Sequence, residues 1–511
     1  SGMAAAQSVD SKPLTFWRPL ETQGLFNSYN EHPAFLKAQE VTGVRVEFID
    51  VSSAAAPEQY NLMIASSSLP DMTCYYWNNF PGGPDLAVKN NLILRLNDDL
   101  PLYAPNYWSI LSNNEEAMRL VKTDEGTHYG LVGLMTYTDS NSPVHQSAGE
   151  RPLFYEASAG LIVRKDWLED LNLDVPVTLD DWHEMLTLFK TEKGASTPLT
   201  WTSYYLDATS QFATSFGITL GLYEDEGAIK YGPIQDEYLD FLTLMHQWYE
   251  EGLLDPDYAV ADNASVLARV QNGGAGAWIG GGGGFIGNPY TNVLASDPDS
   301  RYYPLPVQHP VLSESDGIVK YAYKSYPYLN YATAISAKGE NVEGALKFLD
   351  YAYGAEGDMV FNFGVEGESY VMENGYPKLT DLITKNPDGN SMTAIFNKYV
   401  MLNGSMMVDY ATRVIPRLNY GIPEAATCTD TWAVAQHPVQ LPPTTIPTAR
   451  AEEYADLYNE ISTYVVEART RFIMGLDPLQ DFEAYVRRVE AMGVQDMIDI
   501  QQEALGNFYQ R

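Results

Sequence analysis

The chain has little cysteine and no long apolar run, and each scarcity excludes a class of protein. Two cysteines among 511 residues, Cys74 and Cys428, cannot build a disulfide scaffold, and their positions leave open whether they pair. Because Cys74 lies in a predicted strand, a buried free thiol is favoured. No stretch reaches the ~18 consecutive apolar residues of a membrane-spanning helix, so we expect no such helix.

Basic residues are also scarce. Lys and Arg number 31 against 67 Asp and Glu, which gives a net charge of −36. Such a surface repels phosphate backbones and anionic headgroups, so nucleic acid is excluded as a partner and so is direct contact with anionic lipid. The acidic residues are spread along the chain rather than massed in a tail, which indicates a folded, solvated surface.

The chain lacks the common motifs of metal and nucleotide chemistry. Its seven histidines show no HExxH and no paired spacing, so metal-dependent hydrolysis has no support, and we predict no metal and no cofactor. The glycine run 280–284 has neither the lysine of a P-loop nor the GxGxxG spacing with a trailing acid. Glycines at a strand end instead let the backbone approach a ligand closely, which makes Gly280 a candidate ligand contact.

Tyrosine, in contrast, is abundant, with 36 residues. Its apolar face and polar tip suit surfaces that hold half-polar ligands, although large α/β cores also use it. A chain of this length is too long for a single core, so two lobes or more are expected.

The first lobe is predicted from alternating strand and helix patterns. Strands are expected at 14–17, 44–51 and 72–76, with helices beginning at Pro33 and at Glu58. The order βαβαβ predicts a parallel sheet, and ligands of such sheets lie beyond the carboxyl ends of the strands. These ends carry aromatic, amide and guanidinium groups, which suit a sugar ring and its hydroxyls. The candidate ligand contacts here are Trp17, Arg18, Asn30, Tyr75, Tyr76 and Trp77, with packing inside the lobe as the competing interpretation of the tryptophans.

A second α/β lobe is predicted to open with the segment 161–182. A buried strand begins at Leu161, and Thr178 with Asp181 forms a capping box at the start of a helix. Later in the chain, aromatic residues occur at the ends of predicted strands and in a proline-rich stretch. The candidate ligand contacts of this part are Trp201, Tyr204, Trp278 and Trp432.

Five segments, in the same order, resemble one family. They are QYNLMIASSSLPDM, HYGLVGL, GLIVRKDWLEDLNLDVPVTLDDW, NFGVEGESYVMENG and FIMGLDPLQDFEAYVRRVEAMGVQDMIDIQQEAL. They resemble the large lipoprotein-type extracellular solute-binding proteins of bacterial ABC importers (family 1, the LplA-like group). The resemblance implies a two-lobed α/β fold of the periplasmic-binding-protein type II, with hinge strands and extra C-terminal helices. We expect lobe 1 to comprise residues 1–152 and 311–378, and lobe 2 to comprise 153–310 and 379–511.

The resemblance also implies a function. We expect a monomeric, non-enzymatic receptor that holds an oligosaccharide in an aromatic-lined cleft between the lobes, closes by a hinge and delivers the sugar to the ABC permease. A neutral oligosaccharide is the favoured ligand, and a uronate-containing one, held by Arg18 or Arg151, is the alternative. The start, SGMAAAQSVDSKP, is compatible with a removed export signal or lipid-anchor region, so we expect an anchored protein at the outer face of the cytoplasmic membrane.

One feature departs from the family pattern. Many relatives carry an EF-hand-like calcium loop where this chain has 190–198. Calcium needs six or more oxygen ligands, several of them carboxylates, and this stretch offers Glu192 beside two lysines. We therefore predict no calcium at this position.

A glycoside hydrolase is the competing hypothesis, and a surface adhesin or structural glycan module is a third. A hydrolase would need two carboxylates ~5–9.5 Å apart. Glu366 and Asp71 are candidates, but so acidic a chain supplies such candidates in any fold. Glu366 is also retained as a candidate ligand contact. Release of products from an oligosaccharide would contradict a receptor, and an unchanged radius of gyration at saturation would favour the adhesin.

Overall fold

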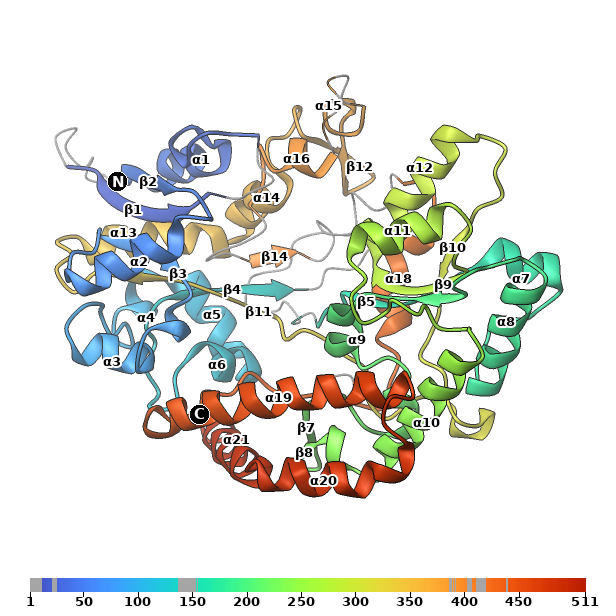
Figure 1. Ribbon diagram of the computed structural model, residues 1–511. Helices are drawn as coiled ribbons and strands as arrows, with labels where there is room; N and C mark the ends of the chain where they lie inside the picture. Colours follow the sequence, from blue (N-terminus) through green and yellow to red (C-terminus); the bar gives the residue numbers. More distant parts are fainter. Residues whose placement is uncertain are drawn as a thin grey trace. The chain divides into compact units, whose positions relative to one another are not determined.

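The computed structural model describes residues 12–20, 25–136, 153, 155–385, 388, 390, 392–401, 407–409, 420–437 and 440–511 (Figure 1). The chain divides into two compact units. Unit 1 comprises residues 1–154, 327–416 and 508–511, and unit 2 comprises 155–326 and 417–507. No helix among the described residues has the length and apolar character needed to cross a lipid bilayer.

Unit 1 is built on a six-stranded mixed sheet of order β14-β4-β11-β3-β1-β2. Its strands are β1 (Leu14–Pro19), β2 (Val46–Val51), β3 (Met72–Tyr75), β4 (Leu131–Thr136), β11 (Tyr328–Ile335) and β14 (Met407–Asp409). β1 is parallel to both β2 and β3, which confirms the predicted βαβαβ start. β11 lies antiparallel between β3 and β4, so a late segment of the chain completes the centre of this sheet.

Helices surround this sheet, and local sequence explains where they begin and end. In α1 (Pro33–Thr42), Pro33 occupies the first turn, the Nδ1 of His32 accepts the Ala34 N–H at 3.3 Å, and Gly43 ends the helix at φ 70°. The other helices of the unit are α2 (Ala56–Ala65), α3 (Gly83–Lys89), α4 (Leu100–Tyr103), α5 (Pro105–Asn113), α6 (Glu115–Val121), α13 (Val342–Asp350), α14 (Ala355–Phe363), α15 (Asp381–Thr384) and α16 (Met392–Phe396).

The segment that follows residue 379 differs from the sequence-based expectation. It was expected in lobe 2, but the structure places 379–416 in unit 1. The hairpin of β12 (Tyr370–Glu373) and β13 (Tyr376–Leu379) pairs Leu379 with Tyr370, and both belong to a small core with Phe363 and Val400. Residues 311–326, expected in lobe 1, lie in unit 2.

Unit 2 is built on a four-stranded sheet of order β10-β5-β9-β6. Its strands are β5 (Ala159–Arg164), β6 (Leu199–Thr200), β9 (Ala277–Gly281) and β10 (Pro304–Pro306). The predicted capping box opens α8 (Leu179–Thr191): the Thr178 hydroxyl accepts the Asp181 N–H at 3.1 Å, and the Asp181 carboxylate accepts the Thr178 N–H at 2.8 Å. The predicted scaffold segment 161–182 is therefore confirmed.

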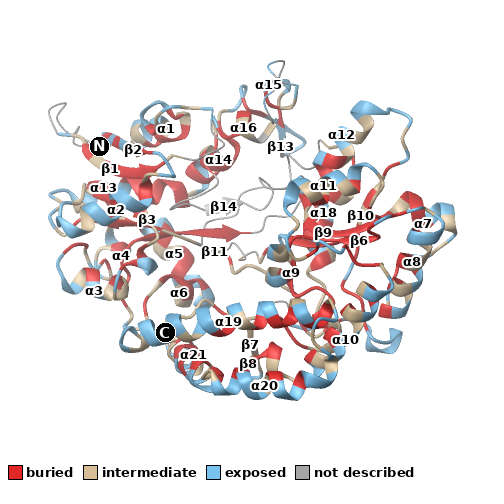
Figure 2. Ribbon diagram, viewed as in Figure 1, coloured by how far each residue is buried: buried red, intermediate tan, exposed pale blue. Residues whose placement is uncertain are grey.

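The remaining elements of unit 2 pack around this sheet, and Figure 2 shows buried residues concentrated on the strands and on parts of the helices. They are α7 (Lys165–Leu171), α9 (Ser203–Thr209), the hairpin β7 (Leu222–Asp225) and β8 (Ala228–Tyr231), α10 (Glu237–Glu250), α11 (Asn263–Gln271), α12 (Asn288–Ser296), α18 (Glu424–Trp432), α19 (Ala451–Ile473), α20 (Phe482–Ala491) and α21 (Val494–Tyr509), whose last residues belong to unit 1. The buried guanidinium of Arg469 on α19 pairs with Asp207 on α9.

A glycine at the centre of the unit 2 sheet is required by the packing of α18. A Cβ added at Gly160 would lie 2.3 Å from the Trp432 ring. Gly160→Ala is therefore expected to destabilise the protein by about 1–3 kcal/mol through overpacking. Gly506→Ala on α21 is the matched control, since a Cβ there meets no atom within 4 Å and alanine favours helix by up to about 1 kcal/mol. Urea unfolding measures both, and an equally stable Gly160→Ala protein would contradict this packing.

His32 makes the stability of unit 1 depend on pH. Burial lowers its pKa from 6.5 to about 4. Between these values the unfolded chain binds a proton that the folded chain excludes, so stability falls as the pH falls, by up to about 1.4 kcal/mol per pH unit. His32→Asn keeps a capping acceptor but removes the titration, so its thermal midpoint should fall less steeply below pH 6.5. An unchanged slope in His32→Asn would contradict this dependence on His32.

Candidate functional site

In unit 1, three tyrosines form a partly exposed cluster at the carboxyl end of β3. Tyr75 ends this strand, Tyr76 follows it, and Tyr331 comes from β11. The ring centroids of Tyr76 and Tyr331 are 4.2 Å apart at an interplanar angle of 68°, and those of Tyr75 and Tyr76 are 5.2 Å apart. The structure therefore brings predicted contacts Tyr75 and Tyr76 together with a third ring that the sequence-based analysis missed.

An amide and hydroxyl network lies beside these rings. The Asn78 amide donates to the Tyr328 hydroxyl and, at 3.0 Å, to the Asn330 Oδ1. The Tyr129 hydroxyl lies 3.3 Å from the Asn78 Oδ1 and 3.2 Å from the Tyr328 hydroxyl. Asn330 has a left-handed φ of 55°, which most residues avoid and asparagine tolerates. We refer to Tyr75, Tyr76, Asn78, Tyr129, Tyr328, Asn330 and Tyr331 as the Tyr/Asn cluster.

The groups of the cluster are neutral. Burial raises the pKa of the Tyr331 hydroxyl, and the hydrogen bond between Tyr331 and Tyr76 raises this pKa further. Burial likewise raises the pKa of Tyr75 and Tyr328, and holds that of Tyr129 well above its ordinary value. These hydroxyls stay protonated at neutral pH, so the cluster offers aromatic faces together with uncharged donors and acceptors. Such groups bind hydroxylated, uncharged compounds.

The two tryptophans predicted at these strand ends are buried within unit 1. Trp17 is 1% exposed, meets the Tyr75 ring edge-on at 5.6 Å and donates to the Gln59 amide oxygen at 3.4 Å. Trp77 is fully buried and donates to the Thr73 carbonyl at 3.1 Å. Both indoles are covered by their own unit, so a ligand would reach them only after their neighbours moved.

Three further candidates of unit 1 are held by contacts of their own or lie in an exposed turn. The buried guanidinium of Arg18 lies over Tyr29 and Phe35, with carbon-to-centroid distances of 5.2 and 5.6 Å. Asn30 is exposed, but its side-chain amide is hydrogen-bonded to the backbone of Phe48. The Asn30 Oδ1 accepts the Phe48 N–H at 2.8 Å, and the Asn30 Nδ2 donates to the Phe48 carbonyl at 3.1 Å. Glu366 is exposed in the turn before β12. Arg151, named with Arg18 for a uronate, lies outside the described residues.

In unit 2, the predicted tryptophans are also buried. Trp278 donates to the Phe285 carbonyl at 3.1 Å, Trp432 donates to the Leu161 carbonyl at 2.9 Å, and Trp201 meets the Tyr258 ring at 5.7 Å. All three are at most 1% exposed. That these indoles touch a ligand stays a prediction, and in the structure their visible role is to fix neighbouring segments.

One predicted residue of unit 2 is accessible. Tyr204, near the start of α9, is 72% exposed. Its ring meets Tyr205 at 5.3 Å, and Tyr205 in turn meets Phe285 at 5.4 Å. A Cβ at Gly280 would lie 2.2 Å from the Phe285 ring, so Gly280 makes room for this aromatic run rather than standing open to a ligand. Tyr205 and Phe285 were missed by the sequence-based analysis.

The segment in place of the calcium loop is held by ion pairs and hydrogen bonds. Lys190 donates to the Glu251 carbonyl at 2.5 Å, and Lys193 pairs with Asp170 at 2.6 Å. Across the described ranges, no group of three or more His, Cys, Asp or Glu side chains is arranged to hold a metal ion.

Comparison with known families decides the identity of the chain. The profile of the family described as "Bacterial extracellular solute-binding protein" matches residues 29–359, more than half of the chain. The chain belongs to this family. Members of this family bind solutes and are not enzymes, in agreement with the sequence-based assignment. The carboxylate of Asp71, a candidate acid of the hydrolase hypothesis, instead accepts the Thr15 N–H at 2.8 Å and hydroxyl at 2.9 Å.

Two curated relatives are similar to this solute-binding protein at low identity. Lipoprotein LipO of Bacillus subtilis is 21% identical over 68% of this chain and 65% of its own length. The fructooligosaccharide ABC transporter substrate-binding protein FusA of Streptococcus pneumoniae is 25% identical over 47% of this chain and 44% of its own length. The matches thus span less than two thirds of either relative.

Solved structures show the fold of this solute-binding protein. An HMO-binding, ABC-transporter-associated solute-binding protein from Bifidobacterium longum infantis aligns with a TM-score of 0.70 and 18% identity, covering 98% of this chain and all of the other. The expected two-lobed α/β fold of periplasmic binding proteins is thereby confirmed.

The lysine-rich turn 190–198 gives a prediction about metal. Because ion pairs and hydrogen bonds of Lys190 and Lys193 hold this segment, a chelator should remove nothing that stabilises it. Thermal midpoints with and without an excess of EDTA are expected to agree. A clear drop in EDTA that added calcium reverses would show that a stabilising metal is bound.

Proposed function

We propose that this protein is the substrate-binding receptor of a carbohydrate ABC importer and that its ligand is an oligosaccharide. The observation that carries the proposal is the Tyr/Asn cluster, partly exposed at a strand end in a member of a solute-binding family. Aromatic faces pack on the C–H faces of sugar rings, and amides and hydroxyls bind sugar hydroxyls. That the relative FusA is named for a fructooligosaccharide supports the same ligand class.

A neutral oligosaccharide fits this cluster best. Its side chains are all uncharged, and the protein as a whole carries a net charge of −36, which opposes the approach of an anionic glycan. A uronate-containing oligosaccharide remains the alternative ligand. It would need a cation, and Arg18, one of the two arginines named for it, is buried over the Tyr29 and Phe35 rings, so binding through Arg18 requires it to leave its present contacts.

The expected mechanism is closure of the receptor around its ligand. A ligand enclosed by side chains of both units would stabilise a closed state by its greater affinity for that state, and closure would present the receptor to the permease. We propose that the protein acts as a monomer, anchored by lipid at the outer face of the cytoplasmic membrane. Small-angle scattering with saturating sugar tests closure, which predicts a smaller radius of gyration.

Calorimetry with matched neutral and uronate oligosaccharides tests the ligand class. We expect binding of a neutral oligosaccharide without release of products, and weaker or no binding of the uronates. A protein that binds only uronates would contradict the neutral ligand, and product release would contradict a receptor.

Single substitutions test two predicted ligand contacts, Tyr76 of the cluster and the exposed Tyr204 of unit 2. Tyr76→Ala and Tyr204→Ala should each weaken binding about tenfold, because loss of an aromatic face costs on the order of 1.4 kcal/mol. Tyr458→Ala, at a 44% exposed position on α19, is the matched control and should bind as the wild type does. Wild-type affinity in Tyr76→Ala would remove the cluster from the site.

A further inference from the structure

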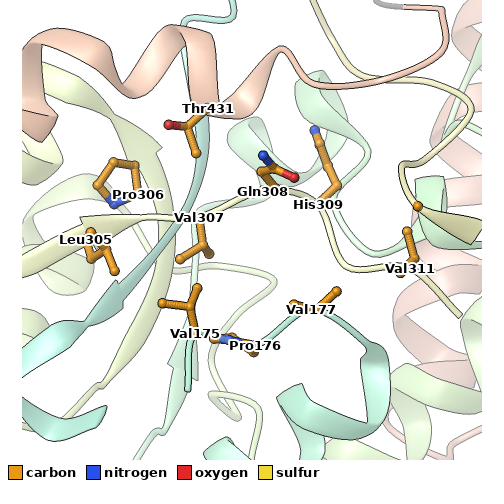
Figure 3. Close-up of a pocket in the computed structure, with 11 residues that line it drawn as sticks. Val175, Pro176, Val177, Leu305, Pro306, Val307, Gln308, His309, Val311 and Thr431 are labelled. Atoms are coloured by element: carbon orange, nitrogen blue, oxygen red, sulfur yellow. The ribbon is translucent and has the colours of Figure 1, made fainter. Parts of the chain in front are cut away.

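Unit 2 carries an apolar cavity that lies outside all the residues discussed as ligand contacts. Its volume is about 340 Å³. Figure 3 shows its two main walls, formed by Val175, Pro176 and Val177 on one side and by the stretch from Leu305 to Val311 on the other, with Thr431 above. A dry cavity of about 150 Å³ can hold benzene, so this one accommodates a ring-sized apolar group.

The walls are fixed by backbone hydrogen bonds. The Val311 N–H donates to the Val177 carbonyl at 3.0 Å, and the Leu179 N–H donates to the Val311 carbonyl at 3.1 Å. The Val307 N–H donates to the Leu161 carbonyl of strand β5 at 3.0 Å. The cavity is therefore preformed on the rigid sheet, which lowers the entropic cost of binding to it.

Exposed aliphatic side chains extend the cavity along the surface. Val175 and Val177 are each 46% exposed, and Leu312 and Ile318, which follow the lining residues Val311 and Gly317, are 51% and 37% exposed. Exposed apolar side chains beside a pocket are typical of protein interaction sites, where a few buried anchor side chains supply most of the affinity.

The two segments that form the main walls of the cavity carry charge of a single sign. The two segments that form its walls, 172–181 and 305–318, contain no lysine or arginine. They do contain exposed acidic residues, namely Asp174, Asp180, Glu314 and Asp316. A partner with lysine or arginine beside an apolar side chain would complement this surface.

We propose that this cavity is the docking surface for a protein segment that presents one apolar side chain flanked by basic residues. The inference rests on the proposed function, which makes the partner the permease of the importer. A second copy of this chain is disfavoured as occupant because it would bring the same acidic rim against this one. A free apolar compound bound in the cavity would leave the exposed side chains of Leu312 and Ile318 in contact with water.

The experiment uses the full-length receptor with the permease and ATPase subunits of its importer, reconstituted in proteoliposomes. The readouts are the sugar affinity of the receptor and the receptor concentration that half-maximally stimulates ATP hydrolysis. Val177→Glu combined with Leu312→Glu should leave sugar affinity unchanged and raise this concentration at least about tenfold, because two charges enter the apolar contact. Val260→Glu, at an 82% exposed position of the same unit, is the matched control and should behave as the wild type does.

Charge reversal provides a second, independent arm. Asp174→Lys with Glu314→Lys should weaken stimulation most at low salt and abolish its salt dependence. If the variant with Val177→Glu and Leu312→Glu stimulates the ATPase as the wild type does, the proposal is overturned. It is also overturned if the wild-type receptor is a dimer in solution and the variant is a monomer, because the occupant of the cavity is then a second copy of the chain. A wild-type receptor that neither binds sugar nor stimulates the ATPase would contradict the proposed function. The same result would exclude the permease as the occupant of the cavity.

Discussion

The candidate site of unit 1 depends on the register of one strand. β11 pairs antiparallel with β3 so that Ala332 lies opposite Tyr75. The same register brings Tyr331, one residue earlier, beside Tyr76, and their rings meet at 4.2 Å. On its other edge β11 shifts register against β4 between Tyr328 and Ala332, and the left-handed Asn330 lies in this irregular stretch. Such bulges redirect side chains at strand ends, and here Asn330 and Tyr328 are turned toward Asn78.

This dependence explains what the sequence could and could not predict. Local periodicity predicts the parallel strands β1, β2 and β3, and capping chemistry predicts the capping box of α8. The structure contains both. The position of β11 is set by pairing between residues about 250 positions apart, which no local pattern encodes. The aromatic spacing of Tyr326, Tyr328 and Tyr331 in the sequence was a signal, but it gives no register.

The tryptophans show a second limit of sequence-based inference. They were selected because they follow strand ends and carry large aromatic faces, and the structure buries Trp17, Trp77, Trp201, Trp278 and Trp432 in their own units. An indole has the most apolar area to remove from water, so in a large core it is drawn inward, whereas Tyr75, Tyr76 and Tyr331 remain partly exposed. Residues 379–416 were assigned to the other lobe because no pattern marks which sheet a returning chain joins.

The protein carries two surfaces that differ in chemistry. The Tyr/Asn cluster is polar, neutral and aromatic, and it suits a hydroxylated ligand, whereas the cavity of unit 2 is apolar and acid-rimmed and suits a protein partner. Neither needs a catalytic group, in agreement with a family of solute-binding proteins.

Hydroxyl-radical footprinting of the protein, free and saturated with its tightest-binding neutral oligosaccharide, tests the central claim most directly. If the cluster binds the sugar, oxidation of Tyr75, Tyr76 and Tyr331 falls on saturation while that of the exposed Tyr458 is unchanged. Saturation that leaves all three cluster tyrosines as reactive as in the free protein would contradict this claim.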